Sequence, residues 1–219
     1  MTKERPILFT GDMVRALLDG SKTQTRRAVS GSGAAMLEFL AETTDDLAQE
    51  HESGGLRVWC DDYPEEGSDL LKYRYGQPGD RLWVRETHYI VDEGSQYFYR
   101  ATGGYSQHKE IDEAHGNAPL VWAGPWKPSI FMPRRASRMT LEITSVRVER
   151  LQDISEADAI AEGIERTAHG FWRLYGKPEV NGSYSPVASY RSLWESINGP
   201  GSWALNPWVW VIEFKRIKP

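Results

Sequence analysis

The sequence predicts a single α+β domain in which strands and short helices surround one core. Residues 81–87 and 208–217 alternate side-chain character as strands do, whereas residues 13–18 and 190–197 repeat apolar side chains at helical spacing. Apolar residues make up 40% of the 219 residues, which is ample material for a packed interior. This length is long for one small barrel and short for two domains, so we expect one core with insertions at about 31–70 and 165–189.

The first thirty residues are expected to form a strand at 6–9, a helix and a polar strand. Thr10 can cap the helix at its start, and Gly20 suits a left-handed stop. Residues 20–27, GSKTQTRR, form an octet that sets a lysine, two threonines and two arginines directly after the helix. Because Lys22 and Thr25 are three positions apart, a regular strand would point them in opposite directions, so a shared site requires a turn or bulge.

Residues 31–70 form a strongly acidic segment with eleven acidic side chains and one arginine. The rest of the chain is therefore mildly basic although the net charge is -5. We expect a helix at about 35–49 and a strand at 56–60, both outside the main core. The segment is either a solvated surface element or a flap that shields a basic cleft.

The middle of the chain offers an aromatic side chain and several cations. The strand predicted at 81–87 places Trp83 and Arg85 on one face, with Glu86 as a further candidate on the other face. A strand is also expected at 96–101. Residues 126–138, WKPSIFMPRRASR, combine Arg134, Arg135 and Arg138 with aromatic and proline residues, a composition that suits phosphate contact and base stacking. The alternative is a surface loop that enters the next strand.

The last third of the chain is expected to contain a strand at 141–151, a helix that begins at Ser155, a helix at 190–197 and a final strand. Glu162 falls near the end of the first helix, where the helix dipole disfavours an acid, so we expect it to have a specific partner. In the final strand, Trp208 and Trp210 share one face and are expected to be core residues.

Several functional classes receive no support from the composition. No segment reaches the roughly 18 apolar residues of a membrane span, and residues 1–8 lack the apolar stretch of a signal peptide. The single cysteine, Cys60, fits a reducing cytoplasm. The five histidines are scattered, so we expect neither a metal nor a cofactor.

The pattern G-x-K-x-x-T-x-R, formed by Gly20, Lys22, Thr25 and Arg27, resembles the signature of the ASCH family. Three further segments resemble the same family, namely YGQPGDRLWVRE at 75–86, ISEADAIAEGI at 154–164 and WVWVIEFKRI at 208–217. The chain is similar over most of its length to the longer ASCH proteins encoded by phages and prophages. The resemblance implies a PUA-like mixed β-barrel with flanking helices and an acidic insertion.

The resemblance also implies a chemistry. In ASCH amidohydrolases, the residues that match Lys22, Thr25 and Glu162 are the catalytic group, and the substrate is acetylated cytidine. Threonine needs an adjacent base, and a lysine can serve if burial or neighbouring cations such as Arg26 and Arg27 lower its pKa. Recognition of a nucleic acid or modified nucleoside is then expected in a basic cleft, whose candidate residues are Thr23, Arg26, Arg27, Trp83, Arg85, Arg134, Arg135 and Arg138.

Two alternatives stay open at the level of sequence. The domain can bind RNA or DNA without turnover, with Lys22 as a phosphate contact, or it can act as a ribonuclease. For the ribonuclease, the sequence shows neither a carboxylate cluster for metal nor a histidine pair for acid–base cleavage.

Overall fold

The computed structural model describes residues 2–43, 47–52, 55–60, 71, 74–91, 96–102, 104–105, 126–177 and 180–217. Within the two predicted insertions, residues 44–46, 53–54, 61–70 and 178–179 lie outside the described residues. The predicted acidic segment is therefore described only in part.

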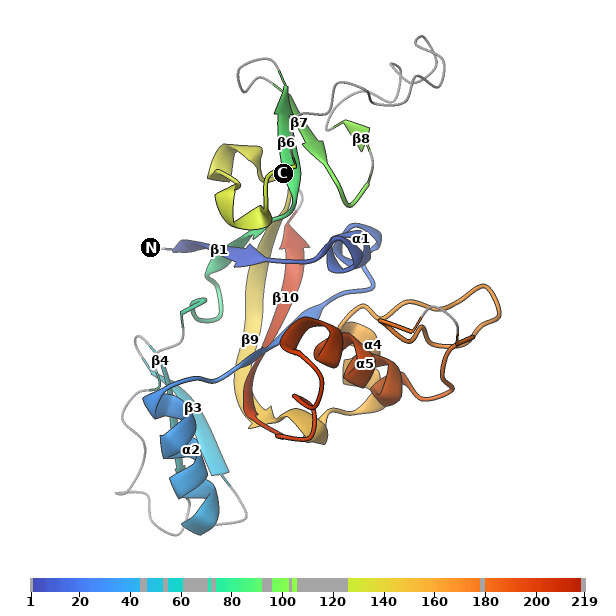
Figure 1. Ribbon diagram of the computed structural model, residues 1–219. Helices are drawn as coiled ribbons and strands as arrows, with labels where there is room; N and C mark the ends of the chain where they lie inside the picture. Colours follow the sequence, from blue (N-terminus) through green and yellow to red (C-terminus); the bar gives the residue numbers. More distant parts are fainter. Residues whose placement is uncertain are drawn as a thin grey trace.

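A five-stranded, mainly antiparallel sheet organises the described chain and confirms the α+β class. Its order is β1-β5-β9-β10-β2, and only β1 and β5 run parallel. Figure 1 shows β9 and β10 as the long central pair. The strands are β1 (Glu4–Leu8), β2 (Gln24–Ala28), β5 (Arg81–Arg85), β9 (Thr140–Arg150) and β10 (Trp208–Ile217).

Three helices flank this sheet, and each begins or ends as its sequence predicts. They are α1 (Gly11–Asp19), α4 (Glu156–Ala161) and α5 (Pro186–Asn198). The Thr10 side chain caps α1, and Gly20 ends it with a φ of 85°. Ser155 caps α4 by accepting from the Asp158 amide at 3.1 Å.

Two smaller sheets lie outside the main one (Figure 1). The helix predicted at 35–49 is wrong at its end, because residues 47–52 are a strand. That strand pairs with the next one, and the Gln49 amide holds both backbone groups of Val148 at 2.9 Å. These elements are α2 (Ser32–Thr43), β3 (Leu47–Glu52), β4 (Gly55–Cys60), β6 (His88–Val91), β7 (Gln96–Tyr99) and β8 (Gly104–Tyr105), with 3-10 helices η3 (Ser129–Phe131), η4 (Arg134–Ala136) and η5 (Leu151–Asp153).

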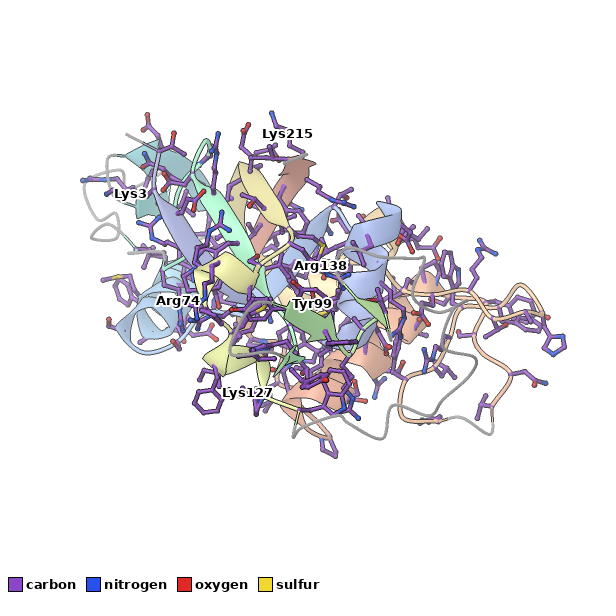
Figure 2. The ribbon with its side chains drawn as sticks, turned by 90° about the horizontal axis from the view of Figure 1, so that it is seen from above. Lys3, Arg74, Tyr99, Lys127, Arg138 and Lys215 are labelled. Carbon is purple, nitrogen blue, oxygen red and sulfur yellow. The ribbon has the colours of Figure 1, made fainter. Side chains whose placement is uncertain are left out.

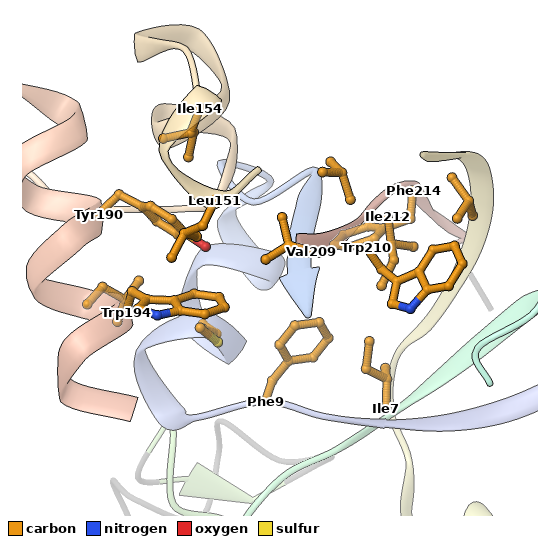
Figure 3. Close-up of a cluster of buried hydrophobic side chains, with 14 of the residues drawn as sticks. Ile7, Phe9, Leu151, Ile154, Tyr190, Trp194, Val209, Trp210, Ile212 and Phe214 are labelled. Carbon is orange, nitrogen blue, oxygen red and sulfur yellow. The ribbon is translucent and has the colours of Figure 1, made fainter. Parts of the chain in front are cut away.

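The core lies between the sheet and the helices α1, α4 and α5, and it extends to Leu37 of α2 and Val58 of β4, contrary to the expectation that these two elements lie outside it. Trp208 and Trp210 are buried in it, as predicted, and β10 is buried on both faces from Trp208 to Ile212. Figure 3 shows Tyr190 and Trp194 extending from α5 toward the cluster of apolar side chains. β10 lies between β9 and β2 in the sheet, and its apolar side chains join the same core cluster as Tyr190 and Trp194.

The two edge strands of the sheet, β1 and β2, approach each other. Arg27 Nη2 donates to the carbonyl oxygen of Leu8 at 2.7 Å, so a side chain from one edge reaches the backbone of the other. Phe9, which follows β1, also meets Phe214 of β10 with ring centroids 6.4 Å apart. The sheet is therefore strongly curved, and the octet lies where its edges converge.

Candidate active site

Lys22 and Glu162 form a buried ion pair between the start of β2 and the end of α4. Lys22 Nζ donates to Glu162 Oε2 at 2.8 Å and to the Glu162 carbonyl oxygen at 2.7 Å. Both side chains are almost completely buried. The expectation that Glu162 has a specific partner is confirmed, and that partner is the lysine of the octet.

The backbone around Lys22 departs from the regular polar strand that the sequence predicted. Lys22 forms an isolated bridge with Glu162, the Thr23 amide donates to the Ala161 carbonyl oxygen at 2.9 Å, and β2 begins only at Gln24. The chain therefore pairs with the end of α4 before it joins β10. This irregularity removes the strict alternation that would have separated Lys22 from Thr25.

Arg26 supplies a second cation to Glu162. Its Nη1 lies 3.3 Å from Glu162 Oε1, its Nη2 lies 3.1 Å from Asp158 Oδ2, and the same guanidinium pairs with Glu149. The Arg26 side chain has no exposed surface. Arg26 is thus enclosed by three carboxylates, and this placement does not support the direct phosphate contact that we expected of it.

This environment lowers the pKa of Lys22. The main cause is burial, which penalises the charged amine; the Glu162 carboxylate opposes the shift, and the positive charges of Arg27 and Arg26 add to it. When Lys22 loses its proton, Glu162 keeps a hydrogen-bonded cation in Arg26. The site can therefore hold a neutral lysine without leaving a buried carboxylate unpaired.

Thr25 lines the same small cavity as Glu162. Its Oγ1 is buried and has no hydrogen-bond partner among the described residues. Thr25 and Glu162 both line a cavity of about 50 Å³, together with Tyr190 and Trp194 of α5. Burial raises the pKa of Tyr190 well above its ordinary value, so the Tyr190 side chain that lines the cavity stays a neutral phenol. Thr25 and Glu162 thus share one cavity, and Glu162 also binds Lys22 Nζ at 2.8 Å.

A second, larger cavity of about 560 Å³ lies next to the small one. The two cavities share Met13, Arg27 and Ile197 in their linings. Arg27 Nε is buried without a partner among the described residues, and its guanidinium lies 5.4 Å from the Phe9 ring centroid. Arg100 also lines the larger cavity, which therefore combines the Phe9 ring with the cations of Arg27 and Arg100.

Three of the other predicted binding residues form a stack of their own. Trp83 is buried, and the guanidinium groups of Arg85 and Arg134 lie 4.7 Å and 6.0 Å from its ring. Arg134 also pairs with Glu4 at 3.0 Å. Because base stacking requires an accessible ring face, the buried Trp83 does not offer the platform that we expected.

The remaining candidates are spread over the neighbouring surface. Arg138 makes a two-pronged pair with Glu86 at 2.8 and 2.9 Å and lies 4.1 Å from the Tyr99 ring centroid, beside which it appears in Figure 2. Arg135 donates to the Tyr97 hydroxyl at 3.0 Å. The Thr23 side chain is exposed. The arginines of residues 134–138 are therefore separate from the buried group formed by Lys22, Arg26 and Glu162.

Sequence reasoning missed the contribution of α5 to the site. Tyr190 and Trp194 were visible only as apolar residues one helical turn apart, and their spacing predicted a core face. The polar atoms on that face, a phenol and an indole N–H, were the available signal. Arg100 carried no signal of its own in the sequence.

Comparison of the chain with protein-family models, with curated proteins and with solved structures returned no match. None of the helices in the described part of the chain is both long enough and apolar enough to cross a bilayer. Within that same part, no group of three or more histidine, cysteine, aspartate or glutamate side chains is arranged to hold a metal ion.

Proposed function

We propose that this protein is an amidohydrolase of the ASCH type, built on a PUA-like barrel, that removes the acetyl group from acetylated cytidine. The observation that carries the proposal is the buried Lys22–Glu162 pair together with Thr25, which lines the same small cavity as Glu162 and whose hydroxyl has no partner among the described residues. A nucleophile, a lysine with a lowered pKa and a carboxylate that orients the lysine are the three groups that acyl transfer to a threonine requires.

The proposed reaction has two steps. Thr25 Oγ1 attacks the amide carbon while its proton passes to the neutral Lys22 amine, and the C–N bond breaks as that proton is returned to the leaving exocyclic amine. Cytidine departs and an acetyl ester remains on Thr25. Water then attacks the ester, releases acetate and restores the hydroxyl, with Lys22 again as the base.

The larger cavity suits the nucleoside part of this substrate. Its volume of about 560 Å³ lies in the range of about 300–1,000 Å³ that is typical of small-molecule sites. The Phe9 ring offers an apolar wall, and Arg27 and Arg100 offer donors to hydroxyl or phosphate oxygens. A base held there would present its acylated amine toward the small cavity at Thr25.

Incubation of the purified protein with acetylated cytidine tests the proposal. The nucleoside is supplied free and within an oligoribonucleotide, and acetate release is measured. We expect turnover by the natural protein, and its loss in Lys22→Met, Thr25→Val and Glu162→Gln, with partial activity in Thr25→Ser. Equal acetate release by the natural protein and Thr25→Val would rule out the threonine ester.

A second function, nucleic-acid binding without turnover, is favoured by one surface. Ile130 and Phe131 of η3 are 56% and 69% exposed, and η4 begins with Arg134 and Arg135 after two intervening residues. Exposed apolar side chains beside cations suit single-stranded nucleic acid. A pure binder would hold an oligoribonucleotide with steep salt dependence and release no acetate.

A further inference from the structure

The small cavity between β2 and α5 holds two buried polar atoms that lack partners. These atoms are Thr25 Oγ1 and Trp194 Nε1, and neither has a hydrogen-bond partner among the described residues. Both residues line the same cavity of about 50 Å³. Buried polar groups in proteins are almost always hydrogen-bonded, so two unpartnered groups at one cavity indicate that a ligand completes them.

The chemistry of these two atoms restricts what the ligand can be. An indole N–H can only donate, so the group that meets Trp194 must be an acceptor. The threonine hydroxyl can donate its proton and attack with its oxygen. The rest of the wall includes the apolar side chains Met13, Leu193 and Ile197. A carbonyl oxygen attached to a small apolar group matches this lining.

We propose that this cavity is the acyl pocket of the enzyme, in which Trp194 Nε1–H donates to the carbonyl oxygen that Thr25 attacks. The inference rests on the proposed function and adds to it a catalytic residue and a limit on acyl size. The cavity is small, about 50 Å³, so we expect it to favour an acetyl group over longer acyl chains.

The indole is held firmly on its helix. Trp194 is only 5% exposed, its carbonyl oxygen accepts from Asn198 Nδ2 at 3.1 Å, and its ring lies 6.5 Å from that of Tyr190. In Figure 3 both rings extend from α5 on the same side. A fixed donor in a site shielded from water stabilises the negative charge that forms on the carbonyl oxygen during attack.

Replacement of the indole by a phenyl ring tests the donor directly. In Trp194→Phe, we expect kcat for acetate release to fall about 10²-fold to 10³-fold while KM changes little, because the donor acts mainly on the charge of the transition state. Trp208→Phe is the matched control, since Trp208 lies in β10 and does not line the cavity. A folded Trp194→Phe variant with unchanged kcat overturns the proposal. The proposal is also overturned if Tyr190→Phe lowers kcat while Trp194→Phe does not, because the donor would then be the phenol.

The size limit gives a second test. Rates with acetyl, propionyl and butyryl amides of cytidine should fall steeply with chain length in the natural protein. Ile197→Ala should raise the relative rate of the longer acyl groups, because Ile197 lines the cavity and is partly exposed, so its truncation enlarges the pocket at small cost to the core. Equal selectivity in the natural protein and Ile197→Ala would contradict an acyl pocket at this position.

A measurement without turnover separates this inference from the proposed function. The indole 1H–15N signal of Trp194, assigned through Trp194→Phe, is followed in Thr25→Val as acetamide or acetylated cytidine is added. We expect this signal to shift, with the Trp208 signal unchanged. If the Trp194 signal shifts but the natural protein releases no acetate, the inference of an acyl-binding pocket stands and the proposed amidohydrolase activity is refuted. If the natural protein releases acetate, the Trp194 signal does not shift and Trp194→Phe is fully active, the amidohydrolase activity stands and only the acyl pocket at Trp194 is refuted.

Discussion

At the scale of single residues, the site depends on how one carboxylate is divided between two cations. Glu162 binds Lys22 through Oε2 and Arg26 through Oε1, and all three side chains are buried. The positive charges of Arg27 and Arg26 help to lower the pKa of Lys22, and Arg26 still pairs with Glu162 when Lys22 loses its proton. Arg26 is therefore a positioning residue that allows Lys22 to be neutral.

We expect turnover to rise with pH through the lowered pKa of Lys22, because the neutral amine is the base. In Arg26→Gln, Glu162 has only Lys22 as a cation, so the pKa of Lys22 rises and the pH–rate profile moves to higher pH. Arg147→Gln is the control, since Arg147 pairs with Glu149 and Asp158 at 3.1 and 3.4 Å while Glu162 is held by Lys22 and Arg26. An identical profile in a folded Arg26→Gln variant would show that Arg26 does not tune Lys22.

The same pKa predicts how stability depends on pH. Because the folded state lowers the pKa of Lys22 from its ordinary value of 10.5, the unfolded chain binds more protons between the folded pKa and 10.5. The free energy of unfolding therefore rises with pH across that window through this residue and levels off above it. Urea denaturation of the natural protein and Lys22→Met should show this rise only in the natural protein; parallel curves would contradict a lowered pKa.

At the scale of elements, the short helix α4 delivers Glu162 to the octet. Its six residues are capped by Ser155 at the start, and Gly163 follows Glu162 with a φ of 81°. A Cβ atom at Gly163 would lie 2.7 Å from the Cβ atoms of both Ala16 and Lys22. Only glycine allows the end of α4 to approach α1 and Lys22 this closely.

Substitution at two glycines measures this close approach. Gly170 also has a positive φ, 82°, but nothing lies within 4 Å of the place that a Cβ atom would take there. Gly170→Ala should therefore lower the free energy of unfolding by about 1 kcal/mol through backbone strain alone. Gly163→Ala should cost about 1–3 kcal/mol more from overpacking, and should also reduce turnover by displacing Lys22. Urea denaturation gives both free energies of unfolding. Equal losses in the two variants would mean that Gly163 is not closely packed against Ala16 and Lys22.

At the scale of the whole molecule, curvature of the sheet gathers the functional groups where its edges converge. Arg27 connects the two edges through Leu8 and lines both cavities, while Arg100 approaches the larger one from the end of β7. The net charge of -5 is thus compatible with a locally basic site, because electrostatic attraction acts over roughly 10 Å at moderate salt.

Salt dependence should report the part that Arg100 plays in substrate binding. If Arg100 contacts a phosphate of an acetylated oligoribonucleotide, Arg100→Gln should weaken binding and reduce the slope of log K against log salt by about 0.7. Affinity for the free nucleoside should change little. Arg191→Gln is the control, since Arg191 pairs with Glu195 on α5 and lines neither cavity. Binding titrations at several salt concentrations decide the outcome. An unchanged slope would show that Arg100 does not contact a phosphate.

Local sequence signals predicted the helices and strands more reliably than they predicted which side chains contact one another. The caps at Thr10 and Ser155, the stop at Gly20 and the core role of Trp208 were all predicted correctly, because each depends on neighbours in sequence. The helix at 35–49 was extended too far, since pairing with β4 outweighed local propensity after Thr43. The burial of Arg26 could not be predicted, because its carboxylate partners lie more than 120 positions away.

The sequence by itself determined which groups are available, namely a lysine, a threonine and two arginines after a helix stop, and an acid at the end of a short helix. It determined them because capping and periodicity act within a few residues. Only the tertiary structure decided that Lys22 meets Glu162 across 140 positions, that Arg26 is enclosed by acids, and that Trp194 shares a cavity with Thr25. Those outcomes depend on the curvature of the sheet and the docking of α4 and α5, which no local pattern encodes.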